Sequence, residues 1–159
     1  MPAAFQITPA TTPGDLAAVA DLFQAYARAL PVDLGYQDFA AELAGLPGKY
    51  APPGGELLLA RDAHGQPIGC VALRPLPDPG TCEMKRLYLA PEARGLGLGR
   101  ALAAAIIDAA RGLDYRELRL DTLAGMTTAI ALYERLGFQR IAPYYAPTPE
   151  GTVFMALGL

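Results

Sequence analysis

The chain has 159 residues and a mass of 16.7 kDa, which is enough for one domain with a sizeable core. Hydrophobic residues make up 52% of it and charged residues 18%, a balance that excludes an intrinsically disordered chain. The net charge of −3 argues against a general nucleic-acid binder, whose affinity would depend on clustered Lys and Arg. We therefore expect a single domain over residues 1–159.

Several residue types are missing or rare, and this excludes whole classes of chemistry. The chain contains no Ser and no Asn, which removes serine hydrolases and N-glycosylation sites. His64, Cys70 and Cys82 do not have the spacing of metal ligands. We therefore predict no metal site, and two buried free thiols.

The apolar residues are not arranged as in a membrane or secreted protein. The longest apolar stretch, residues 101–107, has seven residues, whereas a membrane span needs about 20. Residues 1–8 show neither the basic nor the apolar region of a secretory signal. We expect a cytoplasmic protein with no membrane partner.

Hydrophobic spacing and turn residues predict the elements along the chain. Pro13 suits the first turn of a helix that Pro31 ends, and Gly112 and Gly137 close two later helices. In chain order, we predict a strand over 5–8, helices over 13–30 and 36–46, strands over 56–61, 67–76 and 82–89, a helix over 96–111, a strand over 116–121, a helix over 126–136, and strands over 138–142 and 152–157.

This order of elements indicates the fold class. Three consecutive strands joined by short turns predict an antiparallel meander, and the strand–helix–strand unit that follows predicts one parallel crossover. Helices on both faces of such a sheet give an α/β protein, a three-layer α/β/α sandwich with a mixed, mostly antiparallel central sheet.

The strongest motif is glycine-rich and lies between a predicted strand and a predicted helix, over residues 94–100 (RGLGLGR). Its three glycines let the main chain approach a ligand closely, and N–H groups at a helix start favour an anion such as a phosphate. The spacing matches neither the GxGxxG dinucleotide motif nor a P-loop. The alternative is a tight strand-to-helix turn that needs glycine for steric reasons alone.

In its context, this segment resembles the acyl-CoA signature of the GNAT superfamily of N-acetyltransferases. The signature R/Q-x-x-G-x-G/A is met by Arg94, Gly97 and Gly99. A second landmark of the family, A-x-x-L-Y-x-x-x-G-F, is met by Ala129, Leu132, Tyr133, Gly137 and Phe138. The resemblance extends to the predicted order of helices and strands, and it implies a GNAT-like fold and an N-acetyltransferase with acetyl-CoA as co-substrate.

The resemblance also implies which residues hold acetyl-CoA. Its pantetheine arm would pair with the main chain of Leu87, Tyr88 and Leu89, where an N–H group could serve as the oxyanion hole for the thioester carbonyl. Many family members place an Asn that contacts CoA where this chain has Met126, so that contact is not expected here. The diphosphate would lie on Arg94, Gly95, Leu96, Gly97, Leu98, Gly99 and Arg100.

Two residues are implied in catalysis. Tyr133 matches the usual tyrosine of the family and would protonate the departing thiolate. The pKa of a phenol, about 10, is close to that of a thiol. Glu83, eleven residues before Arg94, would deprotonate the amine directly or through water. The alternatives are a core tyrosine on an amphipathic helix, and a strand glutamate that pairs with Arg74 or Lys85.

The acceptor is the least determined part. We predict a primary amine of a small molecule, because the loop over 143–151 contains three prolines and could close the acceptor groove. A protein or peptide acceptor and a non-catalytic acyl-CoA-binding module are the alternatives, and a homodimer is left open. Aromatic residues that could line this end are Tyr26, Phe39, Tyr50, Tyr144 and Tyr145.

Overall fold

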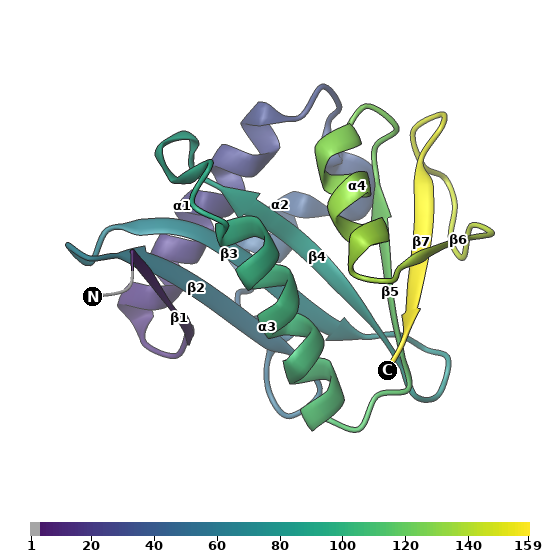
Figure 1. Ribbon diagram of the computed structural model, residues 1–159, viewed down its shortest axis with the longest axis horizontal. Helices are drawn as coiled ribbons and strands as arrows, with labels where there is room; N and C mark the ends of the chain where they lie inside the picture. Colours follow the sequence, from purple (N-terminus) through teal and green to yellow (C-terminus); the bar gives the residue numbers. More distant parts are fainter. Residues whose placement is uncertain (1–3) are drawn as a thin grey trace.

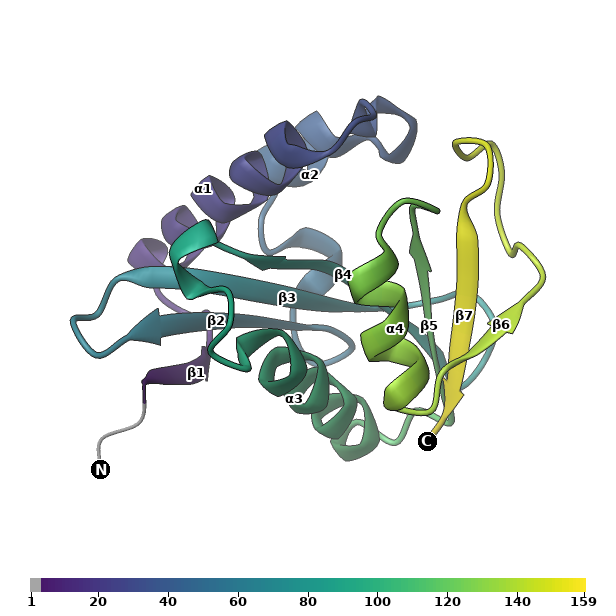
Figure 2. The same ribbon diagram turned by 45° about the horizontal axis from the view of Figure 1, so that its top comes forward.

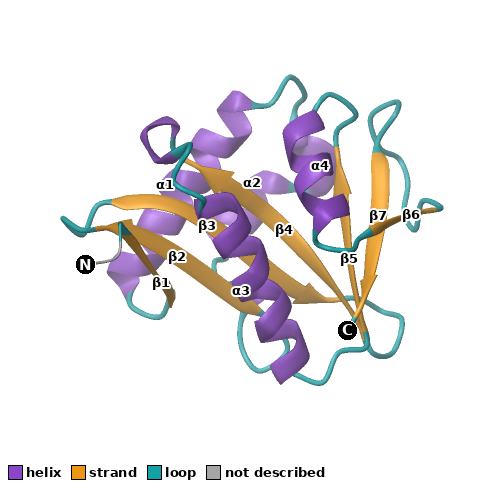
Figure 3. Cartoon of the chain, in the orientation of Figure 1, coloured by secondary structure: helices purple, strands orange, loops and turns teal. Residues whose placement is uncertain are grey.

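A computed structural model describes residues 4–159, apart from the side chain of Tyr36. Residues 1–3, part of the stretch expected not to be a secretory signal, lie outside the described residues. The predicted order of strands and helices is confirmed (Figures 1 and 3). In chain order the elements are β1 (Phe5–Pro9), α1 (Pro13–Ala29), η1 (Leu34–Gln37), α2 (Phe39–Ala44), η2 (Gly48–Tyr50), β2 (Glu56–Asp62), β3 (Pro67–Pro75), β4 (Thr81–Leu89), η3 (Pro91–Ala93), α3 (Leu98–Gly112), β5 (Glu117–Thr122), α4 (Thr127–Arg135), β6 (Gln139–Ile141) and β7 (Val153–Gly158), where η marks a short 3-10 helix.

Three helices begin later than predicted, α4 by one residue and the other two each for a local reason. The helix expected over 36–46 is divided into η1 and the six-residue α2, because Asp38 between them has a left-handed φ of 57°. The helix expected from residue 96 begins at Leu98, because Gly97 before it has a φ of 77°. A left-handed residue cannot lie within a right-handed helix, so both positions mark a helix boundary.

The described strands form one sheet in the order β1-β2-β3-β4-β5-β7-β6. Within residues 4–159, β4 and β5 form the single parallel pair, and the other neighbours are antiparallel. Helices α1 and α2 cover one face, and α3 and α4 cover the other (Figure 2). The predicted α/β class, a three-layer sandwich with a mixed, mostly antiparallel sheet, is confirmed.

Each face of the sheet has its own hydrophobic cluster. Helix α3 buries Leu102 and Ile106 against one face, and α1 buries Val19 and Phe23 against the other. Full burial of a side chain of this size contributes about 1.5–3 kcal/mol to folding. These two clusters fix both helix layers against the central strands, from which the polar site described below is built.

The two cysteines of the chain are free and buried, as the sequence predicts. Cys70 and Cys82 are both buried and free, one in each cluster. None of the helices in residues 4–159 is long and apolar enough to cross a bilayer. Within the same residues, no three His, Cys, Asp or Glu side chains lie together as a group that could hold a metal ion.

The parallel pairing of β4 with β5 is short. It covers Thr81–Glu83 of β4, after which the two strands diverge (Figure 1). Residues 84–89 therefore keep a strand neighbour only on the β3 side among the described strands. On that side, Arg86 has a φ of 61° and the register shifts, so that Val71 of β3 lies opposite two residues of β4. This is a β-bulge, which changes the direction in which the following side chains point.

Candidate active site

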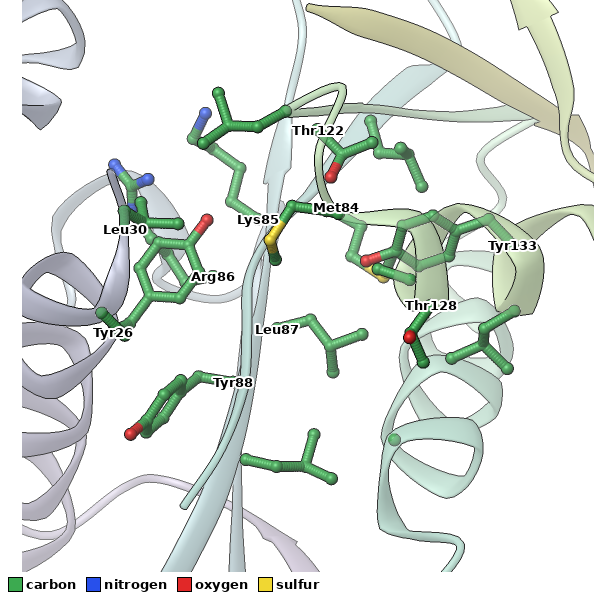
Figure 4. A pocket seen from close by; sticks show the side chains of 18 of the residues that line it. Tyr26, Leu30, Met84, Lys85, Arg86, Leu87, Tyr88, Thr122, Thr128 and Tyr133 are labelled. Atoms are coloured by element: carbon green, nitrogen blue, oxygen red, sulfur yellow. The ribbon is translucent and has the colours of Figure 1, made fainter. Parts of the chain in front are cut away.

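A cavity of about 850 Å³ lies where β4 and β5 separate. Strand β4 forms its floor, α4 and the start of α3 form one wall, and the end of α1 with η1 forms the opposite wall. Figure 4 shows Tyr26, Lys85 and Arg86 on one side of β4, and Thr128 and Tyr133 on the other. The lining residues come from within the segments 26–37, 84–89, 94–100, 120–129 and 132–135.

The glycine-rich segment forms one end of this cavity. Gly95 and Gly97 have φ values of 85° and 77°, a conformation that L-residues with side chains rarely adopt. These turns bring the chain to the N-terminus of α3, where the first N–H groups of a helix have no partner within the helix. The N-terminal end of the helix dipole and the N–H groups together make an anion site.

Most of the residues predicted to bind the cofactor line the cavity. Arg94, Gly95, Gly97, Gly99 and Arg100 line the cavity, and so do Leu87, Tyr88 and Leu89. Leu98 also lines it, although its side chain is fully buried in the α3 cluster. Leu96 is 48% exposed and is not part of the lining. Arg135 lines the cavity as well, and no sequence motif indicated it.

Tyr133, the predicted acid, projects from α4 into the wall of the cavity (Figure 4). Its ring is 6% exposed and packs against the ring of Phe138. Burial raises the pKa of its hydroxyl above the ordinary value. Its hydroxyl makes no hydrogen bond to another residue within 4–159, so the O–H can donate to a bound molecule.

Glu83, the predicted base, is fully buried beside the cavity but is not one of its lining residues. One of its oxygens accepts a hydrogen bond from Arg74 Nε at 2.8 Å and lies 3.6 Å from Lys85 Nζ. The other accepts a hydrogen bond from the Tyr144 hydroxyl at 2.5 Å. Burial alone would raise the pKa of Glu83, but Lys85 and Arg74 outweigh it and hold that pKa below its ordinary value.

Asp121, at the end of β5, is a lining carboxylate that the sequence reasoning missed. Its Oδ2 accepts hydrogen bonds from the hydroxyl of Tyr145 and from Gln37 Nε2. Its Oδ1 faces Lys85 Nζ at 3.9 Å. The position of Asp121 at the end of an alternating strand, twelve residues before Tyr133, was the available signal. The cavity therefore holds a carboxylate that Glu83 was expected to supply.

Arg86 closes the α1 side of the site. Its guanidinium forms a two-point hydrogen-bonded pair with Glu42 at 2.9 and 3.0 Å and donates to Gln37 Oε1 at 2.7 Å. It also lies against the rings of Tyr26 and Phe39, with centroid distances of 5.8 and 5.2 Å. These contacts engage its charge fully, so Arg86 holds α2 and η1 against β4.

The predicted acceptor aromatics have different positions. Tyr26 lines the cavity. Phe39 contacts Arg86, and Tyr50 is fully buried against Phe23 in the α1 cluster. Tyr144 and Tyr145 lie behind the lining, where their hydroxyls hold Glu83 and Asp121. The aromatic residues therefore position the acidic groups more than they form the wall.

The splayed strands, the glycine-rich helix start and the facing tyrosine define an acyl-transferring enzyme of the GNAT class. The family model described as "Acetyltransferase (GNAT) family" matches residues 17–138. The chain therefore belongs to the GNAT family and is an N-acetyltransferase.

Proteins with similar sequences and structures agree with this. An uncharacterized N-acetyltransferase of Schizosaccharomyces pombe is 42% identical over 156 residues, which cover 98% of this chain and 96% of that protein. A solved structure from Klebsiella pneumoniae, described as a candidate acyl-CoA N-acyltransferase, is 33% identical with a TM-score of 0.75 and covers 99% of each chain. The ribosomal-protein-S18-alanine N-acetyltransferase of Escherichia coli is 25% identical with a TM-score of 0.70, covering 97% of this chain and 93% of its own.

The ion pair between the buried Glu83 and the partly exposed Arg74 gives a prediction for stability. Because the pKa of Glu83 is lowered in the folded state, the stability it contributes is present at neutral pH and is lost as the pH falls through its folded pKa. We expect Arg74→Met to lower the free energy of unfolding by about 2 kcal/mol at pH 7, and by less at pH 4 where Glu83 can take a proton. Chemical denaturation at both pH values measures this.

The matched control is Arg140→Met, because Arg140 is 64% exposed and lies 3.9 Å from Glu134. We expect this variant to change the stability by less than about 0.5 kcal/mol at either pH. An Arg74→Met loss that is equal at pH 7 and pH 4 would show that Arg74 does not stabilise the charged form of Glu83.

Proposed function

We propose that the protein, acting as a single domain, transfers the acetyl group of acetyl-CoA to a primary amine of a small molecule. The observation that carries this proposal is that one continuous cavity joins the anion-binding start of α3 to Tyr133 and Asp121. A ligand with a phosphate end and a reactive end can therefore contact both groups at once. The reaction is a direct attack of the amine on the thioester carbonyl.

The residues present fit acetyl-CoA. At the phosphate end, Arg94 and Arg100 add charge to the N–H groups of α3, and Gly99 has no side chain to fill the space toward Leu89. Along β4, the main chain of residues 87–89 lacks a strand neighbour on the β5 side and can pair with an extended amide-containing arm. Acetyl-CoA would supply the activated acetyl group as a thioester.

Tyr133 is proposed as the acid. Its hydroxyl lies in the cavity wall with no partner among the described residues, and its raised pKa keeps it protonated at neutral pH. A proton held there can be donated to the sulfur as the C–S bond breaks. The tyrosine then recovers its proton from water.

Two carboxylates are candidates for the base that removes the proton of the amine. Glu83 has both oxygens engaged behind the cavity wall, so it can act as the base only through Lys85 or a water molecule. Asp121 lines the cavity and has an oxygen, Oδ1, that accepts no hydrogen bond within residues 4–159. On this geometry we assign proton removal to Asp121, and Glu83 as the base stays a prediction.

The mostly apolar wall at the acceptor end supports a small-molecule acceptor. Tyr26, Leu30 and Leu34 form a wall from α1 and η1 on the side away from Tyr133. A protein or peptide terminus is the second candidate, and the Escherichia coli structural relative with 25% identity bears the name of an enzyme of that kind. Comparing turnover of an amine panel with that of a peptide panel distinguishes the two.

The cofactor assignment predicts the effect of a side chain at Gly99. A Cβ there would meet Leu89 and Leu132 at ordinary contact distances of 3.6–3.8 Å, so Gly99→Val is expected to fold. We expect it to weaken acetyl-CoA binding about tenfold or more, measured by titration calorimetry, because its methyl groups enter the cavity. Gly112→Val at the other end of α3, where a Cβ meets nothing within 4 Å, is the control and should bind normally. Equal affinities would remove the helix start from the cofactor site.

The acid assignment predicts a selective loss of turnover. With a primary amine that the wild-type protein acetylates, Tyr133→Phe should lower kcat about 100-fold, while the Kd for acetyl-CoA changes less than about threefold. Tyr115→Phe is the control, because the Tyr115 hydroxyl donates to the Gly54 carbonyl at 2.6 Å outside the cavity lining. Release of free CoA measures both rates. An unchanged kcat in Tyr133→Phe would exclude the tyrosine as the acid.

The base assignment is decided by comparing two isosteric variants. Asp121→Asn should lower kcat/KM about 100-fold at pH 7, because it removes the lining carboxylate that takes the proton. Glu83→Gln should lower kcat/KM far less, because its carboxylate does not line the cavity. The reverse pattern would restore Glu83 as the base and leave Asp121 with a structural role.

A further inference from the structure

Lys85 is a buried cation with ion-pair contacts but no hydrogen-bond acceptor among the described residues. Its side chain is 5% exposed, and it lines the acceptor side of the cavity. Its Nζ lies 3.6 Å from Glu83 and 3.9 Å from Asp121, and within residues 4–159 it makes ion-pair contacts without a hydrogen bond. Burying an ammonium costs several kcal/mol unless its N–H groups find acceptors. A buried cation in this state is suited to bind an acceptor oxygen from a ligand.

The neighbouring carboxylates do not fill this role. Glu83 accepts hydrogen bonds from Arg74 and Tyr144, so its charge is already matched by another cation. Asp121 has its Oδ2 held by Tyr145 and Gln37, which leaves Oδ1 facing Lys85 across 3.9 Å. Lys85 and Asp121 thus form a pair of opposite charges on the cavity wall, separated by more than a hydrogen bond.

We propose that Lys85 binds a carboxylate of the acceptor, so that the acceptor is an amino acid and not a simple amine. This rests on the proposed function and names its substrate class. An α-amino acid carries an ammonium and a carboxylate on one carbon, so it can lie antiparallel to the Asp121–Lys85 pair with each charge facing its opposite. Asp121 then takes a proton from the group that reacts, and Lys85 fixes that group in place.

The other charges around the site support this choice. Arg86, the lining cation next to Lys85 on β4, is fully engaged by Glu42 and Gln37 and so does not compete for the carboxylate. Burial lowers the pKa of Lys85, against the opposing charges of Glu83 and Asp121, and a bound carboxylate would stabilise its charged form further. The apolar side chains of Leu30 and Leu34 remain for the rest of the acceptor.

The test measures binding and turnover separately. The CoA-bound protein is titrated with each of the twenty common L-amino acids, and every one that binds is compared with its amide, which keeps the amine but lacks the negative charge. We expect at least one amino acid to bind about 10- to 100-fold more tightly than its amide, the range of a charge-assisted hydrogen bond. Lys85→Met should abolish this preference, and Lys85→Arg should retain part of it.

Lys49→Met is the matched control. The other lysine of the chain pairs with Glu42 at 3.3 Å, has a side chain that is 36% exposed and is absent from the lining, so this variant should keep the full preference. In turnover, Lys85→Met should raise the KM for the amino acid by a much larger factor than the KM for its amide.

Three results would overturn the inference. The first is that no amino acid binds, and the second is that each amino acid binds as tightly as its amide. The third is that Lys85→Met lowers kcat equally with the amino acid and with its amide, which would make Lys85 a proton acceptor. The proposed function fails on a different result, namely no release of free CoA with any amine, amide or amino acid. Binding of the amino acid through Lys85 would still be measurable in that case.

Discussion

Strands β4 and β5 are hydrogen-bonded along Thr81–Glu83 and then separate, which leaves the main chain of residues 84–89 open on one side. An N–H or C=O group that is buried without a partner costs about 1–3 kcal/mol, so a sheet does not separate at its centre without compensation. Here the main-chain groups left open on the β5 side border the cavity, where a bound ligand can pair with them. The other features of the site depend on this separation, because the cavity exists only where the two strands diverge.

The separation also determines which charges can be buried. Residues 83, 85 and 86 of β4 all place charged side chains on the α1 face, and each is matched by a group from another element. Arg74 from β3 matches Glu83, Glu42 from α2 matches Arg86, and Asp121 from β5 faces Lys85. The first two pairs are hydrogen-bonded and hold layers together. The third pair spans the gap between the diverging strands, and its two charged groups lie 3.9 Å apart, too far for a direct hydrogen bond.

The parts of the site that follow from local geometry could be predicted from the sequence. Gly95 and Gly97 mark left-handed turns before a helix, and Gly137 ends α4 at a φ of 102°, so both motifs of the family fall at element boundaries that glycine signals. Tyr133 follows from its place in the second motif. The order of strands and helices could be predicted as well. The exact starts of α2 and α3 were placed too early, because the left-handed turns at Asp38 and Gly97 delay both helices.

The acceptor half could not be predicted in the same way, because it depends on non-local packing. Arg86 adopts a left-handed φ without being glycine, and the bulge there places Lys85 and Arg86 on the same face, where simple strand alternation would separate them. Asp121 meets Gln37 across 84 residues of sequence, and Tyr145 reaches it only because β7 lies between β5 and β6.

Main-chain recognition and side-chain recognition thus divide the cavity between them. At the α3 end, the groups proposed to bind the cofactor are N–H groups and glycines, so the requirement on the sequence is for glycine at a few positions and leaves a recognisable motif. At the α1 end, the wall consists of side chains such as Tyr26, Leu34 and Lys85, any of which can change without altering the backbone. On the proposed function, this division keeps the donor site constant and lets the acceptor pocket vary, because substitutions on the α1 side leave the geometry of β4 and the start of α3 unchanged.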